Sequence, residues 1–273
     1  MAAKRLPKTI VRRALKALER RRYVRKTRLY CVGTAKSGTH SIAAMFDDAV
    51  RCGHELDNID VIRQILAVSE GKVSESEMMA YIRSRDKRLC LDVDSSQLNF
   101  FLLDYLLSQF SDAVFLLTIR DCYSWLDSFI NDSLCHSATG DWVKFREYRF
   151  NTHMYLHPEE ERPLKERGLY TLDGYLSYWT YHNKKVLSSI SNERLMVIRT
   201  SEITKMAREI AMFAGLMARS VRVEKSHAYR NPIKLNVLGE VDKVHLEAKV
   251  EQHCRELMSI FFPEIRSYSD VRI

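Results

Sequence analysis

The chain has 273 residues, of which 46% are hydrophobic and 29% charged, as expected of a globular protein with a substantial core. It contains no run of about eighteen apolar residues, and its first residues lack an uninterrupted apolar segment before a small-residue cleavage site, so we expect no membrane span, no secretion and a cytoplasmic location. Six cysteines are scattered without a Cys-x-x-Cys pair, which predicts neither a disulfide framework nor a zinc site.

The net charge of +8 is concentrated in the first residues. Residues 1–28 hold twelve Lys or Arg against one acid, Glu19, and thus carry +11, so the rest of the chain carries −3. We expect a basic arm over residues 1–27 and one domain over residues 28–273. Residues 9–25 fit a basic helix that contacts anionic lipid or nucleic acid, or one that simply packs on the domain edge. We favour the second, keep peripheral membrane contact as the alternative, and expect no nucleic-acid partner.

The first element of the predicted domain is a strand followed by a glycine-rich turn. The apolar run LYCVG at 29–33 predicts a buried strand, the segment GTAKSGTHS at 33–41 a turn, and residues 40–50 a helix. Such a turn directs backbone N–H groups and the positive end of a helix dipole at one point. This geometry suits an anion, most often a phosphate.

The loop differs from that of nucleotide triphosphatases. In that form, Lys and then Ser or Thr follow the second glycine directly, and they serve the terminal phosphates and magnesium. Here Thr39 and His40 follow Gly38, and the cation stands two residues earlier, at Lys36. This displacement argues against the usual magnesium nucleotide.

Helical and strand-like segments then alternate along the chain. Residues 57–86 read as helical, with a Ser-x-x-Glu capping box that opens a helix after Ser74. The run LCLDV at 89–93 predicts a second strand, and residues 98–110 predict another helix.

The third strand precedes an informative pair of polar residues. The run AVFLLTI at 113–119 predicts a strand, with Arg120 at its end and a helix over 123–134. Ser128 lies eight residues after Arg120, inside that helix. An Arg supplies a bidentate, permanently charged fork for a phosphate, and a hydroxyl two helical turns later can close the same group from the other side. The alternative is that Arg120 pairs with Asp121 or another carboxylate.

The second half of the chain predicts one irregular insert and one further strand and helix. Residues 135–170 are rich in aromatic and charged residues, as in many lids and substrate loops. The run LMVIR at 195–199 predicts a strand, and residues 204–217 predict a helix. An aromatic stripe at helical spacing is more typical of a core than of a substrate platform; it consists of Tyr175, Tyr178, Trp179 and His182.

Strands that alternate with helices predict a three-layer α/β/α fold with a mostly parallel central sheet. Ligands bind beyond the carboxyl ends of such strands. The loop at 33–41, residues 94–97 and Arg120 follow the first three predicted strands directly. We therefore expect them to converge on one site.

At this point the sequence resembles the PAPS-dependent sulfotransferases. The run Lys36-Ser37-Gly38-Thr39, with Arg120 and Ser128 eight residues apart, is similar to the family's pattern in order and spacing, and the resemblance covers roughly residues 28–217. It implies a P-loop-like turn that holds the 5′-phosphosulfate of PAPS, formed by Ala35, Lys36, Ser37, Gly38, Thr39, His40 and Ser41. It implies that Arg120 and Ser128 hold the 3′-phosphate, and that no divalent metal is needed.

The sequence also departs from the family. Ala35 stands where many cytosolic members have Pro, and Ser41 stands where they have the Trp that offers a stacking surface for adenine. The segment GTHSI is closer to the Gly-Thr-x-Ser-Leu form of some bacterial and carbohydrate-type members. The family's glycine-rich C-terminal loop has its nearest counterpart at 225–234, where Lys225, Arg230 and Lys234 are candidates for closing over the 3′-phosphate.

Transfer of a sulfuryl group calls for a cation at the leaving phosphate and a base at the acceptor. Lys36 fits the first role. For the base, the resemblance points first to Asp94 in DVDSSQ, with Asp92 as an alternative that also suits pairing with Lys36. A carboxylate here also suits the cap of the following helix.

The segment GHELDN at 53–58 adds His54 and Glu55 as second-rank catalytic candidates, because some bacterial sulfotransferases have a similar Gly-His-Glu near the acceptor pocket. The remaining histidines have no metal-ligand spacing, so we expect no metal site.

The sequence thus leads to one main hypothesis and two alternatives. The main hypothesis is a sulfotransferase that uses PAPS and a carbohydrate, lipid or small-metabolite acceptor with a hydroxyl or amine. The alternatives are a small-molecule kinase with an atypical phosphate loop and a non-catalytic nucleotide- or anion-binding protein.

Overall fold

Five parallel strands form the central sheet in the order β2-β3-β1-β4-β5, as seen in the computed structural model, which describes residues 23–46, 49–151, 153–226 and 234–271. The strands are β1 (Leu29–Cys31), β2 (Cys52–His54), β3 (Val93–Ser95), β4 (Val114–Ile119) and β5 (Leu195–Arg199). The central strand β1 pairs Leu29 with Val93 of β3 and with Val114 of β4. Every strand pairing is parallel, as the alternation of strands and helices predicted.

Side chains that alternate along β4 separate two hydrophobic cores, one on each face of the sheet. Phe115 and Leu117 point into the larger core, and Leu116 points into the smaller one. In β1, Tyr30 joins the larger core and Cys31 the smaller. Both faces of the sheet are therefore covered, which confirms the predicted three-layer α/β/α fold.

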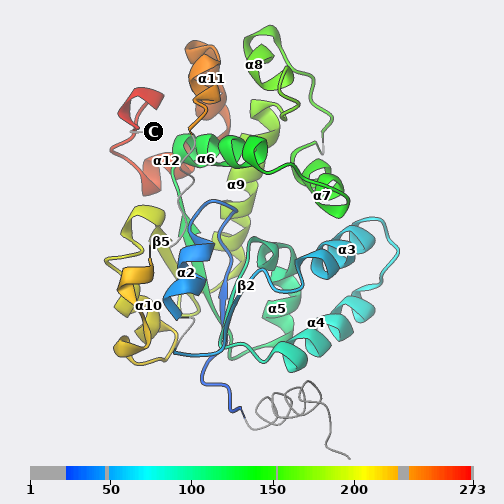
Figure 1. Ribbon diagram of the computed structural model, residues 1–273, viewed down its shortest axis with the longest axis vertical. Coiled ribbons are helices and arrows are strands. Elements are labelled where there is room, and N and C mark those ends of the chain that lie inside the picture. The colour runs from blue at the N-terminus through cyan, green and yellow to red at the C-terminus, as the bar shows by residue number, and fades with distance from the viewer. Residues whose placement is uncertain (1–22, 47–48, 152, 227–233, 272–273) are drawn as a thin grey trace, which may run out of the picture.

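The helices divide between these two faces, and Figure 1 shows α2 and α10 on one side of the sheet and α3, α4 and α5 on the other. The α-helices of the described residues are α2 (Thr39–Phe46), α3 (Asn58–Ser69), α4 (Glu75–Leu89), α5 (Leu103–Gln109), α6 (Cys122–Cys135), α7 (Asp141–Phe150), α8 (Arg162–Lys165), α9 (Leu172–Ser189), α10 (Ala207–Phe213), α11 (Lys243–His253) and α12 (Arg255–Phe261). Helix α6 begins just after β4 and lies across the carboxyl edge of the sheet (Figure 1).

Local signals in the sequence account for several helix starts. The capping box at Ser74 is confirmed, because its side chain accepts a hydrogen bond from the Glu77 backbone N–H and the Glu77 carboxylate accepts one from the Ser74 backbone N–H. Asp121 caps α6 by accepting from the N–H of Ser124. The strands predicted at 113–119 and 195–199 correspond to β4 and β5.

One strand of the sheet was misplaced from the sequence, and another was missed. The strand predicted at 89–93 begins only at Val93, because α4 continues through Leu89 and ends at Cys90, whose backbone is left-handed with φ 48°. Glycine usually takes that position, so a cysteine there gives no sign that the helix ends. Strand β2 was not predicted, since its three residues, CGH, contain no apolar run.

The predicted insert at 135–170 is more regular than its composition indicated. Helix α7 packs on α3 and α9, and it buries Phe145, Arg149 and Phe150. The aromatic stripe on α9 is buried, as predicted.

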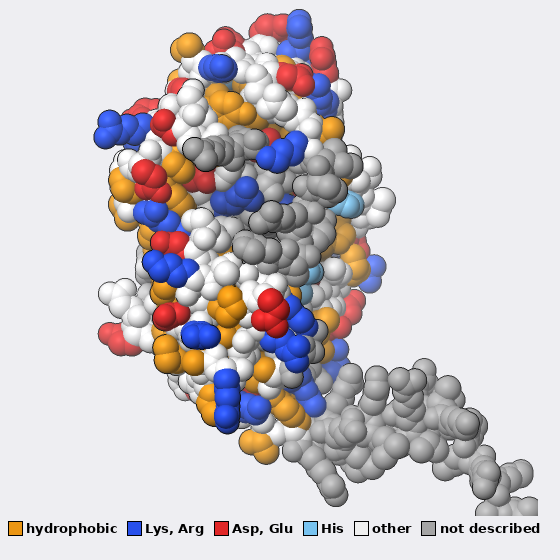
Figure 2. Space-filling view, turned by 60° about the vertical axis from the view of Figure 1, so that its left-hand side comes forward, with side chains coloured by type: hydrophobic (Ala, Val, Ile, Leu, Met, Phe, Trp, Pro, Cys, Tyr) orange, Lys and Arg blue, Asp and Glu red, His pale blue; other side chains and the backbone are white. Residues whose placement is uncertain are grey.

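The remaining sequence expectations concern the distribution of charge, a membrane span and the basic arm. On the face drawn in Figure 2, Lys and Arg side chains are mixed with Asp and Glu over the described surface. No helix among the described residues is long and apolar enough to cross a membrane. Residues 1–22 of the predicted basic arm lie outside the described residues.

Candidate functional site

A cavity of about 870 Å³ lies at the carboxyl edge of the sheet, where the predicted site residues were expected to meet. Every strand contributes to its wall through its last residue or through the segment that follows it. The lining side chains from the strand ends are Lys36, His54, Gln97, Arg120 and Thr200. Helix α6 supplies another wall, with Ser124, Asp127, Ser128, Asn131 and Asp132.

Two glycines are required by the packing of the loop at 33–41. A Cβ on Gly33 would lie 2.1 Å from Thr118 Oγ1 and 2.8 Å from the Thr118 carbonyl oxygen. Gly38 has φ +103°, and a Cβ there would lie 2.4 Å from Ile203 Cδ1. Lys36, between them, is also in the left-handed region, with φ 65°. Such strain in a residue other than glycine is typical of functional loops.

Hydrogen bonds from three surrounding elements fix this loop. Trp125 Nε1 of α6 donates to the Ala35 carbonyl oxygen at 2.9 Å, and Arg120 Nη1 donates to the Lys36 carbonyl oxygen at 3.2 Å. Thr200 Oγ1, just after β5, donates to the Ser37 carbonyl oxygen at 2.7 Å. Side chains from outside the loop thus bind its carbonyl oxygens. The loop then leads into α2, whose first N–H groups have no acceptor within the helix.

The predicted cofactor-binding residues nearly all border this cavity. The lining includes Ala35, Lys36, Gly38, Thr39, His40, Ser41, Arg120, Ser128 and Lys234. Ser37 is fully buried beneath the loop, where its hydroxyl donates to the Thr34 carbonyl oxygen at 2.7 Å. Arg230 lies outside the described residues.

Two cations of the cavity, Lys36 and Arg120, have partners in the chain. Lys36 Nζ lies 3.0 Å from Asp132 Oδ1. Arg120 Nε donates to Ser124 Oγ at 3.0 Å, and burial lowers the pKa of its guanidinium, against the nearby Asp121 and Asp127 carboxylates. Arg120 remains a cation, because an arginine stays protonated at any ordinary pH.

A second group of polar side chains gathers at the end of β2. His54 Nε2 lies 3.3 Å from Thr39 Oγ1, and the His54 and His40 rings are 5.0 Å apart. Burial lowers the pKa of His54. Glu55 follows with φ 48°, and its Oε1 accepts a hydrogen bond from Gln97 Nε2 at 2.9 Å. Both second-rank catalytic candidates, His54 and Glu55, therefore border the cavity.

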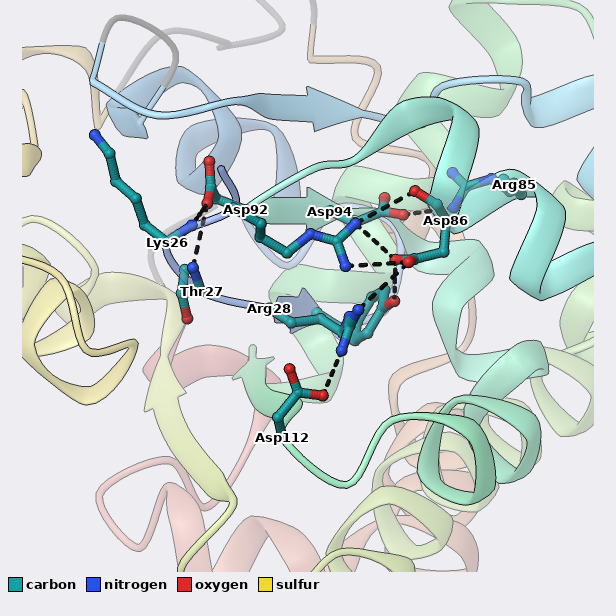
Figure 3. A network of polar contacts seen from close by, with 10 residues as sticks. Lys26, Thr27, Arg28, Arg85, Asp86, Asp92, Asp94 and Asp112 are labelled. Carbon is teal, nitrogen blue, oxygen red and sulfur yellow. Dashed lines mark hydrogen bonds and ion pairs between the residues drawn. The ribbon is translucent and has the colours of Figure 1, made fainter. Parts of the chain in front are cut away.

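Asp94, the first-rank candidate for the base, is not among the residues that line the cavity. It lies within β3, and its carboxylate pairs with Arg85 of α4, Nη1 to Oδ2 at 2.6 Å (Figure 3). Asp94 and Arg85 are both buried. The strand begins later than predicted, so Asp94 lies inside the sheet instead of beyond its edge.

Asp92, the alternative carboxylate, holds the start of the described chain and does not pair with Lys36. Its Oδ1 accepts from the backbone N–H of Lys26 at 2.6 Å and of Thr27 at 3.2 Å (Figure 3). Its Oδ2 accepts from the N–H of Arg51 at 2.9 Å. These bonds give Asp92 a structural role.

The sequence did not single out several lining residues. Asp127, Asn131 and Asp132 lie within one turn of Ser128 on α6, so the helical period from Ser128 was the available signal. Thr200 directly follows the correctly predicted β5. The described residues contain no group of three or more His, Cys, Asp or Glu placed to hold a metal ion.

Comparisons with known proteins found similarity to solved structures. No family model matches the chain, and no curated protein matches it. A crystal structure of a sulfotransferase from Alicyclobacillus acidocaldarius is similar, with 16% identity and a TM-score of 0.46. The similarity covers 87% of this chain and 96% of that chain.

Proposed function

We propose that this protein is a sulfotransferase that moves a sulfuryl group from PAPS to a hydroxyl or amine of a carbohydrate, lipid or small-metabolite acceptor. One observation carries the proposal: the loop after β1 shares a single cavity with Arg120 and with Ser128, eight residues further on. The loop supplies N–H groups and Lys36, and α6 supplies a hydroxyl. This is a donor set for two separate anionic groups.

The lining fits a bisphosphorylated nucleotide. Lys36 and the start of α2 would hold the 5′-phosphosulfate, and Arg120, Ser128 and Lys234 would hold the 3′-phosphate. Phe262 also lines the cavity, and an aromatic ring can pack against a base ring. When bound, PAPS supplies a sulfuryl group already activated by its phosphate.

The chain's own residues would then stabilise the charge of the leaving group and accept a proton from the acceptor. Lys36 stabilises the negative charge that develops on the leaving phosphate oxygen as its bond to sulfur breaks. A base accepts the proton of the acceptor as the new bond to sulfur forms. We assign that role to Glu55, because it lines the cavity and Asp94 is paired with Arg85 outside it. His54 is the neighbouring alternative.

Calorimetry with adenosine 3′,5′-bisphosphate, in the presence of EDTA, tests the donor site. We expect binding by the wild type and a loss of about tenfold or more in Lys36→Ala, since a hydrogen bond to a charged group contributes about 1.5–3 kcal/mol. Lys185→Ala is the matched control, because Lys185 is paired with Asp104 on the surface, 3.0 Å away. It should bind as the wild type does.

The outcome also separates the three functional hypotheses. ATP binding that requires magnesium, without bisphosphate binding, would indicate the kinase instead. Binding of neither nucleotide would contradict the proposed donor. A bisphosphate-binding protein that transfers no label from ³⁵S-PAPS to any of a panel of carbohydrate, lipid and amine acceptors would be a binding protein only.

A further inference from the structure

Arg149 of α7 is a buried cation without a carboxylate partner among the ion pairs of the described residues. It is 6% exposed, and its guanidinium carbon lies 4.5 Å from the ring centre of Phe145 and 4.7 Å from that of Phe150. Burial lowers its pKa. Burying an unpaired charge is costly, so Arg149 requires an explanation beyond packing.

The guanidinium fixes the orientation of an amide at the cavity wall. Arg149 Nη1 donates to Gln97 Oε1 at 2.7 Å. Arginine has donors and no acceptor, so the oxygen of Gln97 must face it. The Gln97 NH₂ group must then face the other way, where Nε2 lies 2.9 Å from Glu55 Oε1. The usual uncertainty between the oxygen and nitrogen of a glutamine amide is thereby resolved.

The end of this chain of contacts is the cavity. Gln97 and Glu55 both line it, whereas Arg149 is not among the lining residues. Glu55 has a left-handed backbone, φ 48°, directly after β2. A left-handed backbone at a residue other than glycine is strained, and it persists only where the surrounding structure holds it. The hydrogen bond from Gln97 Nε2 fixes the direction in which the Glu55 carboxylate points.

We propose that Arg149 and Gln97 are positioning residues that hold the Glu55 carboxylate oriented at the cavity, where it can accept a proton from the acceptor. This assignment rests on the proposed function, because it deepens the role of Glu55 as the base. Among the described residues, His54 is an ionisable neighbour of Glu55, and His54 in turn interacts with His40 and Asp94.

Gln97→Glu is the decisive variant. Its carboxylate keeps a partner for Arg149, so the fold is retained, but the donor to Glu55 becomes a second negative charge. A like charge disfavours ionisation. We expect the acidic limb of the pH–kcat profile to move to higher pH and kcat at neutral pH to fall by about tenfold to a hundredfold, the order of loss for a misplaced catalytic group. KM for PAPS should stay within about twofold of the wild type, because the donor site is untouched.

Gln109→Glu is the matched control, because Gln109 at the end of α5 also accepts from an arginine, Arg83 Nη1 at 2.6 Å, but does not line the cavity. It should leave kcat and the pH profile unchanged. A wild-type profile in Gln97→Glu, or an equal shift in both variants, would overturn the proposal.

Arg149→Met separates positioning from a structural role. Methionine has a similar length and removes the buried charge, and it leaves no buried carboxylate unpaired because Arg149 has no such partner among the ion pairs of the described residues. We expect the midpoint of urea unfolding to be retained while kcat falls, because the Gln97 amide is free to turn. Unchanged kcat in this folded variant would overturn the proposal.

A readout without turnover keeps the two proposals distinguishable. The side-chain ¹³C resonance of Glu55, assigned from its absence in Glu55→Gln, should titrate at higher pH in Gln97→Glu than in Gln109→Glu. An identical titration would overturn the positioning role whatever the reaction is. A wild-type protein that transfers no sulfuryl group would instead overturn the proposed function.

Discussion

Lys36 and Asp132 form an ion pair across the candidate site, from the loop after β1 to helix α6, with 3.0 Å between Nζ and Oδ1. Asp132 Oδ1 also lies 3.4 Å from His136 Nδ1. The cation that we assign to the leaving phosphate is therefore held by a carboxylate of the chain. An incoming anion must share or replace this carboxylate.

Asp132→Asn should tighten the binding of adenosine 3′,5′-bisphosphate. Asparagine keeps the shape and loses the charge that competes with the anion. A partly exposed ion pair contributes up to about 1 kcal/mol, which corresponds to about fivefold in the dissociation constant. Calorimetry at constant ionic strength measures the change.

Asp141→Asn is the control for the change in net charge, because Asp141 pairs with Arg63 at 2.7 Å and does not line the cavity. Its affinity should match that of the wild type. Weaker binding by Asp132→Asn would mean that Asp132 orients Lys36 for the anion instead of competing with it.

Ser128→Ala should weaken adenosine 3′,5′-bisphosphate and leave adenosine 5′-phosphosulfate, which has no 3′-phosphate, almost unaffected. The hydroxyl lines the cavity wall that α6 forms. A hydrogen bond to a charged group contributes about 1.5–3 kcal/mol, so we expect a loss of about tenfold or more for the bisphosphate alone. Competition binding with both nucleotides measures the ratio.

Ser108→Ala controls for the loss of a helix hydroxyl, since Ser108 Oγ donates only to the Tyr105 carbonyl oxygen on the exposed side of α5 among the hydrogen bonds described. An equal loss for both nucleotides in Ser128→Ala would refute the 3′-phosphate assignment. Arg120→Ala is less selective, because Arg120 also donates to the Lys36 carbonyl oxygen and so supports the loop itself.

Asp94→Asn should lower stability and preserve the turnover of the folded enzyme. The change leaves Arg85 buried without its carboxylate (Figure 3), and breaking a buried ion pair typically costs about 3–5 kcal/mol. Urea unfolding measures the loss, and activity is compared per folded molecule. Asp104→Asn, at an exposed pair, should be close to neutral.

Glu55→Gln should show the reverse pattern. We expect retained stability and a fall of about 10²–10⁴ in turnover, the range for loss of a general base. If Asp94→Asn were inactive but fully stable, and Glu55→Gln active, the base would belong at Asp94.

The sequence predicted those site residues whose positions follow from patterns of neighbouring residues. Glycine spacing marked the loop around Lys36, and a strand end followed by a helix marked Arg120 and Ser128. These residues need only neighbours in the chain to acquire their positions. The cavity brings all three together.

The rest depended on packing between distant segments. Gln97 lies 42 residues from Glu55 and 52 from Arg149, so no local pattern links their side chains. The start of the strand that contains Asp94 was predicted too early, because α4 ends at Cys90 and not at a glycine that would have marked the end of the helix. That boundary decided whether Asp94 lay beyond the sheet or inside it.

His182 of α9 offers a test of the core that supports the loop. It is fully buried, its Nε2 lies 2.7 Å from the Val32 carbonyl oxygen, and its ring stacks on Phe100 with 3.9 Å between centres. Burial lowers the pKa of His182 to about 3, and the charge of Arg149 acts in the same direction. The imidazole is therefore neutral in the folded protein at any ordinary pH.

Stability should consequently fall as the pH is lowered through the histidine range. An unfolded histidine takes up its proton near pH 6.5, and the folded His182 does so only near pH 3. Between these values the unfolded state binds more protons, so the free energy of unfolding decreases by up to about 1.4 kcal/mol per pH unit on acidification. His182→Gln retains a donor for Val32 and does not titrate, so its urea-unfolding free energy should depend less steeply on pH between about 6.5 and 4, by roughly one proton. His153→Gln, at an exposed histidine, is the control, and its unfolding free energy should depend on pH as steeply as that of the wild type. An equal pH dependence in all three proteins would show that His182 is protonated in the folded state.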